Sequence, residues 1–235
     1  MVALVTIGII IGAIVFDIAI THLSQALRMR RLRNSAQHGN ASAVFTLPSH
    51  LNMRISPGMF HYHGHTWLQL LPDGRAVVGM NDLLHRIIGR IDEIHPTDTG
   101  KHLRQGEKAI LIRQGEKLLF LTSPVSGSVI ETNSALRSDP ALSKQDPYNN
   151  GWLFVLNPRN LEIELPHLMV ASQAEQWLHR EISRIRLFFE DLLHRKTPLP
   201  QQNETLQLEG ILEKMDDETW ILFKDLFIYQ WEWRG

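Results

Sequence analysis

The run His-Tyr-His-Gly-His occupies residues 61–65 and places a histidine at every second position. In an extended strand, alternate side chains point to the same face, so His61, His63 and His65 could bring three imidazoles together. Imidazole nitrogen is a common ligand of Zn²⁺ and Cu²⁺, and a metal site, with a metal chaperone as its function, is therefore one interpretation. No fourth ligand is evident near the run, and we favour solvated or packed histidines.

Acid–base or nucleophilic chemistry has little support elsewhere in the chain. Asp92, Glu93 and His95 could exchange protons, but they stand next to the turn residue Pro96, which indicates a solvated edge. Ser126 belongs to the turn sequence Pro-Val-Ser-Gly and lacks the context of a nucleophile elbow. The chain has no cysteine, which excludes disulfides and thiol catalysis. We therefore predict a protein that is not an enzyme and has no catalytic residues.

The composition is ordinary for a folded protein of this size. The 235 residues can form one good-sized domain with appendages, and 43% of them are hydrophobic and 21% charged. The formal net charge is −1, so the global balance gives no sign of a nucleic-acid partner.

The first 33 residues predict a transmembrane helix with a basic end. Residues 2–16 are uncharged and almost wholly apolar, and the stretch 2–24 matches the roughly 20 residues that cross a bilayer. A secretory signal, the main competitor, would begin with positive charge and end at small residues, and neither feature is present. Four arginines follow directly, and they would stay inside and attract anionic lipid headgroups: Arg28, Arg30, Arg31 and Arg33. This predicts a single-pass protein of the inner membrane with its N-terminus outside and its C-terminal domain cytoplasmic.

Two features of this predicted helix favour a protein partner in the membrane. Gly8 and Gly12 form a pair that allows close helix approach, although glycine is also common in membrane helices. Asp17 would be costly against lipid, so it should face protein or water, be protonated, or lie near the interface. We expect integral membrane subunits of a larger complex as partners.

Residues 34–58 resemble a linker or arm, because they mix turn-forming residues with isolated apolar ones. Residues 59–167 instead predict a β domain of short strands separated by turn residues. The expected strands are 65–71, 75–80, 91–94, 108–112, 117–122, 126–132 and 152–156. Asn81 is expected to cap a short helix over 82–88 that ends at Gly89, and 134–142 is expected to form a short helix or turns.

The spacing of apolar residues changes after the β domain. Apolar residues at helical spacing predict an amphipathic helix within 168–196. Residues 197–235 form a C-terminal aromatic tail, with a strand-like 206–212, a helical 219–229 and an end that contains Trp231 and Trp233. Such a tail is costly to leave in water, so it should dock on its own domain, on a partner or at the membrane interface.

Several short motifs occur in one order between residues 60 and 167, and each alone is only turn chemistry. They are His65-Thr66-Trp67, Gly79–Asp82, Gly89–Ile94, Gly100, Leu103–Glu107, Ser123–Gly127, Asn133 and Asp146–Leu153. Together they resemble the glycine cleavage system H protein, a lipoyl carrier. The resemblance implies a mainly β fold, a lipoyl/H-protein-like barrel–sandwich hybrid with flanking helices. To this the sequence adds one N-terminal transmembrane helix and a C-terminal helical extension.

The resemblance also implies where a lipoyl group would be attached. In the family, a lysine at a hairpin tip is acylated with lipoate, ten positions after the residue equivalent to Gly106 and seven before that equivalent to Ser123. Both counts lead to Glu116, and Lys117 is its neighbour. In a strand, a shift of one residue turns a side chain to the opposite face. We therefore expect no cofactor, with a register that presents Lys117 for lipoylation as the alternative.

The local sequence predicts a closed hairpin at this place. Gln114-Gly115 suits a two-residue turn, which would set Arg113 opposite Glu116 and Ile112 opposite Lys117. An arginine opposite a glutamate is a favourable cross-strand pair. This predicts a charge-paired tip rather than an exposed lysine.

The sequence thus predicts a non-enzymatic, membrane-anchored, H-protein-like scaffold subunit of a larger membrane complex, for which respiratory and photosynthetic complexes are natural hosts. Its β domain and C-terminal tail would make cytoplasmic protein contacts. The alternative is a membrane-tethered lipoyl carrier of the glycine-cleavage type, with lipoate on Lys117.

Overall fold

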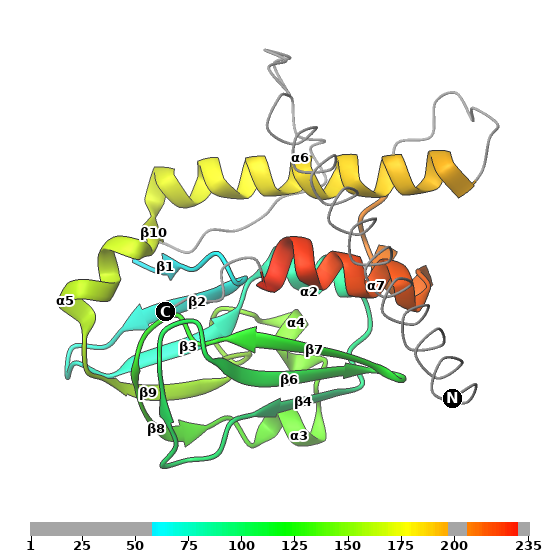
Figure 1. The fold of residues 1–235 in the computed structure, drawn as a ribbon. Coiled ribbons are helices and arrows are strands. Elements are labelled where there is room, and N and C mark those ends of the chain that lie inside the picture. The colour runs from blue at the N-terminus through cyan, green and yellow to red at the C-terminus, as the bar shows by residue number, and fades with distance from the viewer. Residues whose placement is uncertain (1–57, 197–205, 230–235) are drawn as a thin grey trace, which may run out of the picture. The chain divides into compact units, whose positions relative to one another are not determined.

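The computed structural model of the chain describes residues 58–196 and 206–229 (Figure 1). The chain divides into two compact units, one of residues 1–48 and 187–198 and the other of residues 49–186 and 199–235. All the strands belong to the second unit, and the following description concerns that unit. The predicted membrane helix with Gly8, Gly12, Asp17 and its arginines lies outside the described residues, as do residues 34–57 of the predicted arm 34–58 and the pair Trp231 and Trp233.

The strands form two antiparallel sheets. The larger sheet has seven strands, in the spatial order β10 (Met169–Val170), β1 (Phe60–His61), β2 (Thr66–Leu70), β3 (Ala76–Met80), β9 (Phe154–Pro158), β8 (Gly127–Thr132) and β5 (His102–Leu103). The smaller sheet has the order β4 (Glu93–Pro96), β6 (Lys108–Gln114) and β7 (Lys117–Thr122). A β-bulge interrupts the β6–β7 ladder between Lys108 and Ile110. The predicted mainly β architecture is confirmed.

Short helices flank the sheets, and their bounds follow local signals. They are α2 (Asp82–Ile88), α3 (Ala135–Ser138), α4 (Leu142–Gln145), α5 (Leu161–Glu164), the 3₁₀ turns η1 (Leu165–His167) and η2 (Ile211–Lys214), and α7 (Asp217–Phe223), which runs into the π-turn η3 (Lys224–Ile228). The side chain of Asn81 accepts a hydrogen bond from Leu84 N at 3.0 Å, and Gly89 ends α2 with φ = 83°. Both helix signals were predicted and are confirmed. The longest helix of the described residues, α6 (Ala171–Lys196), begins in this unit and occupies the predicted amphipathic stretch.

Trp67 is at the centre of the core and is fully buried. Its indole nitrogen donates to the carbonyls of Met80 and Pro147, each at 3.1 Å, and its ring lies 5.9 Å from that of Tyr148. Gly79 stands opposite Trp67 on the neighbouring strand, and a Cβ there would come within 2.2 Å of the indole. The indole therefore ties β2 to the end of β3 and to the loop before β9.

The C-terminal segment, defined here as residues 206–229, differs from its prediction in the first half. Its residues 206–212 form no strand but lead into η2, whereas α7 and η3 fill the predicted helical part. Gly210, in the left-handed region at φ = 63°, donates its amide to Arg86 O at 2.7 Å. This bond ties the start of the segment to α2, and the bond from Trp220 Nε1 to Leu118 O places α7 beside β7, above which it is drawn in Figure 1. The described part of the tail therefore docks on its own domain.

Candidate functional site

The hairpin of β6 and β7 has a register one residue away from the prediction. Gln114 pairs with Lys117, and Arg113 pairs with Leu118, so the turn residues are Gly115 and Glu116. Gly115 adopts φ = 57°, which glycine tolerates at such a turn. The predicted turn at Gln114-Gly115 is wrong.

The cause of this register is the side chain of Gln114. Its amide group is buried and donates to Ile88 O at 2.8 Å and to Arg90 O at 2.6 Å. These two bonds hold Gln114 in the strand, facing the loop after α2. Asp92 fixes the turn from the same side, since its carboxylate accepts from Gly115 N at 2.7 Å.

The prediction of a charge-paired tip is also wrong. Arg113 forms its ion pair with Glu93 on β4, because those two residues are cross-strand partners. Glu116 is exposed at the tip and, among the described residues, has no ion-pair partner. The tip thus presents a free carboxylate to solvent, and the first amine after it is Lys117.

Lys117 is half-buried under the C-terminal segment. Its ammonium nitrogen donates to Met215 O and lies 5.6 Å from the centre of the Trp220 ring. Residues 215 and 220 are about 100 positions further along the chain, so no local sequence signal pointed to this contact. The candidate attachment residue is therefore held by the extension, not by the hairpin.

The same segment covers the outer edge of β7. Leu118 O accepts from Trp220 Nε1 at 3.2 Å and from Lys224 Nζ at 3.1 Å, while Phe120 N donates to the hydroxyl of Tyr229 at 3.1 Å. β7 is the last strand of its sheet, and these side chains satisfy backbone groups that a strand edge leaves open. The aromatic content of the tail was the only sequence signal for this contact.

The three candidate histidines do not share a face. His61 belongs to β1, but the chain turns at once, with Tyr62 N bonded to Thr66 O at 2.8 Å and His65 N bonded to Tyr62 O at 3.1 Å. His65 then has φ = 61°, so the alternation of an extended strand does not apply. Among the described residues, no group of three histidine, aspartate or glutamate side chains could hold a metal ion.

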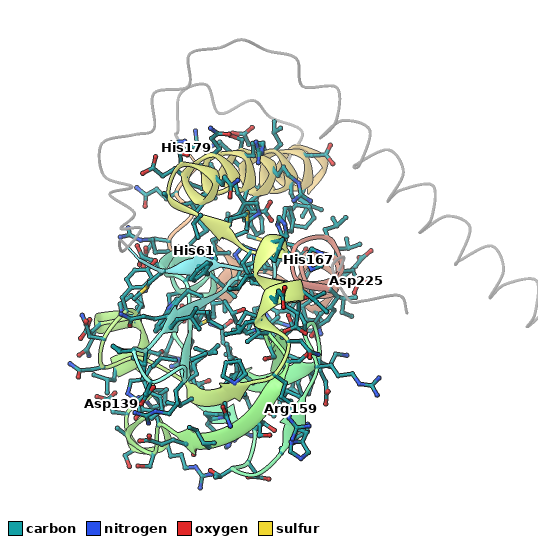
Figure 2. All side chains as sticks on the ribbon, turned by 90° about the vertical axis from the view of Figure 1, so that its left-hand side faces the viewer. His61, Asp139, Arg159, His167, His179 and Asp225 are labelled. Carbon is teal, nitrogen blue, oxygen red and sulfur yellow. The ribbon has the colours of Figure 1, made fainter. Side chains whose placement is uncertain are left out.

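His61 and His65 are instead buried and His63 is half-buried; Figure 2 labels His61 beside the strand β1. Burial lowers the pKa of His61 to about 4, and burial also lowers that of His63. His65 lies 3.7 Å from the buried carboxylate of Glu181 on α6, and its ring is 5.4 Å from that of Trp177. Through Trp177 and Glu181, His63 and His65 pack against the first part of α6.

Replacing Gln114 by alanine is expected to lower the free energy of unfolding by about 1–3 kcal/mol, because the carbonyl of Ile88 at the end of α2 and that of Arg90 in the following loop lose their donor. Urea unfolding of Gln114→Ala against wild type measures the change. The exposed Arg113→Ala serves as the neighbouring control and should shift the free energy by less than about 1 kcal/mol. Equal losses in both variants would contradict the anchoring role of Gln114.

Comparison with known proteins identifies relatives of the domain that carries this hairpin. Residues 60–181 match the family described as glycine cleavage H-protein. The probable glycine cleavage system H protein of Thermococcus kodakarensis is 34% identical over 125 residues, which cover 53% of this chain and 92% of that relative. The H protein of Hydrogenovibrio crunogenus is 33% identical over 115 residues, 49% of this chain and 83% of the relative. The crystal structure of an H protein from Mycobacterium marinum is similar with a TM-score of 0.47 and 26% identity, covering 52% of this chain and 98% of that one.

These findings correct two predictions. The expectation of no cofactor is wrong, because the matching family carries lipoate as its prosthetic group. The predicted location, a single-pass protein of the inner membrane with its N-terminus outside, is also corrected. The relatives are glycine cleavage H proteins, and no helix within residues 58–196 and 206–229 is long and apolar enough to cross a bilayer.

Proposed function

Because this chain belongs to the glycine cleavage H-protein family, we propose that its β domain is a lipoyl carrier with Lys117 as the attachment residue. A carrier of this family acts within an enzyme system and does not itself catalyse the reaction. The observation that supports the assignment is the position of Lys117, the first residue after the exposed turn Gly115-Glu116. The only other lysine of the hairpin, Lys108, stands at its far end.

The residues at the tip fit a covalently attached arm in three respects. Lys117 offers a primary amine, the chemical group that a carboxylic acid acylates to form a stable amide. Its strand is fixed by the β6–β7 ladder, and the turn is fixed by Gln114 and Asp92, so the attachment point is rigid. The exposed Glu116 keeps the tip solvated. A lipoyl group bound there would supply a redox-active dithiolane at the end of a long flexible arm.

Intact-mass measurement of the full chain, produced in cells supplied with lipoate, tests this function. Wild type and Lys108→Ala, the control within the same hairpin, should both carry the mass of one lipoyl group, and Lys117→Ala should carry none. An adduct that persists in Lys117→Ala would place the group elsewhere. Unmodified mass in all three proteins would reject the carrier function.

A docking subunit of a larger assembly is the second candidate function. The observation that favours it is the tip itself, where a carboxylate, Glu116, stands at the outermost position and Lys117 is covered. The H-protein domain would then contribute its surface to a complex. Gentle purification of the tagged full chain, followed by identification of proteins that accompany it in fixed ratio, tests this role, and recovery of the chain alone would count against it.

A further inference from the structure

We propose that the C-terminal segment is a releasable cover over Lys117, and that closure of this cover and acylation of the lysine oppose each other. The inference rests on the proposed function, in which Lys117 is the residue that receives the acyl group. It adds a means of control that lies in residues 206–229, beyond the stretch 60–181 that matches the family.

The ammonium group of Lys117 is enclosed by two residues of the cover. In the closed arrangement, Lys117 Nζ donates to Met215 O and lies over the face of Trp220 at 5.6 Å. An activated acyl donor must approach this nitrogen along its lone pair, after a proton has left. Met215 and Trp220 occupy two of the directions from which the donor would come, so the closed cover hinders the reaction.

Acylation removes the positive charge of Lys117, on which one contact with the cover depends. With an acyl adenylate as donor, a new bond joins Nζ to the acyl carbon, and the bond from that carbon to the phosphate oxygen breaks. The adenylate leaves as AMP with the electron pair, and the ammonium group gives up two protons to solvent. The product nitrogen is a neutral amide with a single N–H, so the cation–π attraction to Trp220 disappears. Acylation therefore weakens the closed cover, and by linkage a closed cover disfavours acylation to the same degree.

The cover is bonded to the edge of β7 by side chains and not by a strand. Its contacts with the edge of β7 come from the side chains of Trp220, Lys224 and Tyr229. Among the described residues, β7 shares a backbone ladder with β6 only. The cover can leave the edge without breaking any strand pairing, but its departure exposes the buried side chains of Trp220, Phe223 and Phe227, so the closed arrangement predominates in the unmodified chain. Gly210 stands directly before η2 and packs against Gly89 at the end of α2. This contact and the bond from Gly210 N to Arg86 O can remain in place when α7 moves.

Chemical acylation of the purified full chain tests the cover without any enzyme. A small N-hydroxysuccinimide acetate ester is added, and peptide mapping gives the labelling rate of Lys117 relative to that of the exposed Lys101. In wild type, Lys117 should react roughly tenfold more slowly than Lys101. The double variant Lys224→Ala/Tyr229→Phe removes two fastenings without opening a core cavity, and it should raise the Lys117 rate several-fold while Lys101 is unchanged. Equal rates for the two lysines in wild type, or an unchanged Lys117 rate in the variant, would overturn the proposal.

Ile221→Ala is the matched control, because this side chain is exposed on α7. It should leave both labelling rates as in wild type, and an increase equal to that of the double variant would also count against a specific fastening. Hydrogen exchange at the Phe120 amide, which donates to Tyr229, provides the reciprocal readout. Exchange should be faster in chain acetylated at Lys117, and equal exchange would overturn the coupling.

The outcomes separate this inference from the function on which it rests. If Lys117 becomes more reactive in the double variant but no lipoyl mass is found in cells, the cover stands and the carrier function fails. If lipoate is found on Lys117 and the fastening variants change neither labelling nor exchange, the carrier function stands and the cover fails.

Discussion

Alanine at position 67 is expected to remove about 3–5 kcal/mol from the free energy of unfolding. Trp67 is fully buried, and its loss leaves a large cavity beside Gly79, which has no side chain that could fill the space. The change also leaves the carbonyls of Met80 and Pro147 without their shared donor. Each carbonyl without a partner adds its own cost.

Urea unfolding followed by circular dichroism measures this effect, and Trp67→Phe is the graded control. Phenylalanine keeps most of the buried area but cannot donate to the two carbonyls, so its loss should be clearly smaller than that of alanine. A Trp67→Ala protein that loses less than about 1 kcal/mol would show that the indole does not join β2 to its neighbours.

Acid is expected to destabilise the domain through two buried histidines. Burial lowers the pKa of both His61 and His85 to about 4, whereas each would titrate near 6.5 in the unfolded chain. Between these values, the unfolded chain binds protons that the folded domain does not. The free energy of unfolding is therefore highest above pH 6.5. It decreases as the pH drops towards 4, by about 3 kcal/mol for each histidine.

Unfolding curves at several pH values between 7.5 and 4 measure this dependence. His85→Gln removes one titrating group and should make the dependence visibly shallower in that window. His179→Gln, an exposed position on α6, should keep the wild-type slope. Identical slopes in wild type and His85→Gln would contradict a neutral, buried His85.

Local signals predicted the parts of the fold that depend on neighbouring residues. Asn81 and Gly89 bound α2 as expected, because a cap and a left-handed terminus act within one helical turn. The strands of the hairpins were also expected from alternation and turn residues. The motifs shared with the H-protein family predicted the architecture that joins them.

The features that the sequence did not predict depend on contacts between residues far apart in the chain or on a local turn. The hairpin register depends on Gln114 reaching Ile88 O and Arg90 O, and two adjacent turn positions look equally suitable without those acceptors. The metal-site interpretation of the histidine run requires an extended strand, whereas a tight turn follows His61. The contact of Lys117 with Met215 joins residues 98 positions apart, which no spacing rule could indicate.

The covered edge of β7 has a consequence for how the protein behaves in concentrated solution. A bare outer strand is a template for sheet extension between molecules, and natural proteins block such strands to avoid aggregation. Here the Tyr229 hydroxyl and the Trp220 indole occupy the groups that a neighbouring molecule would use. Without these two side chains, β7 could pair with a strand of a neighbouring molecule, and repeated pairing of this kind would produce insoluble assemblies.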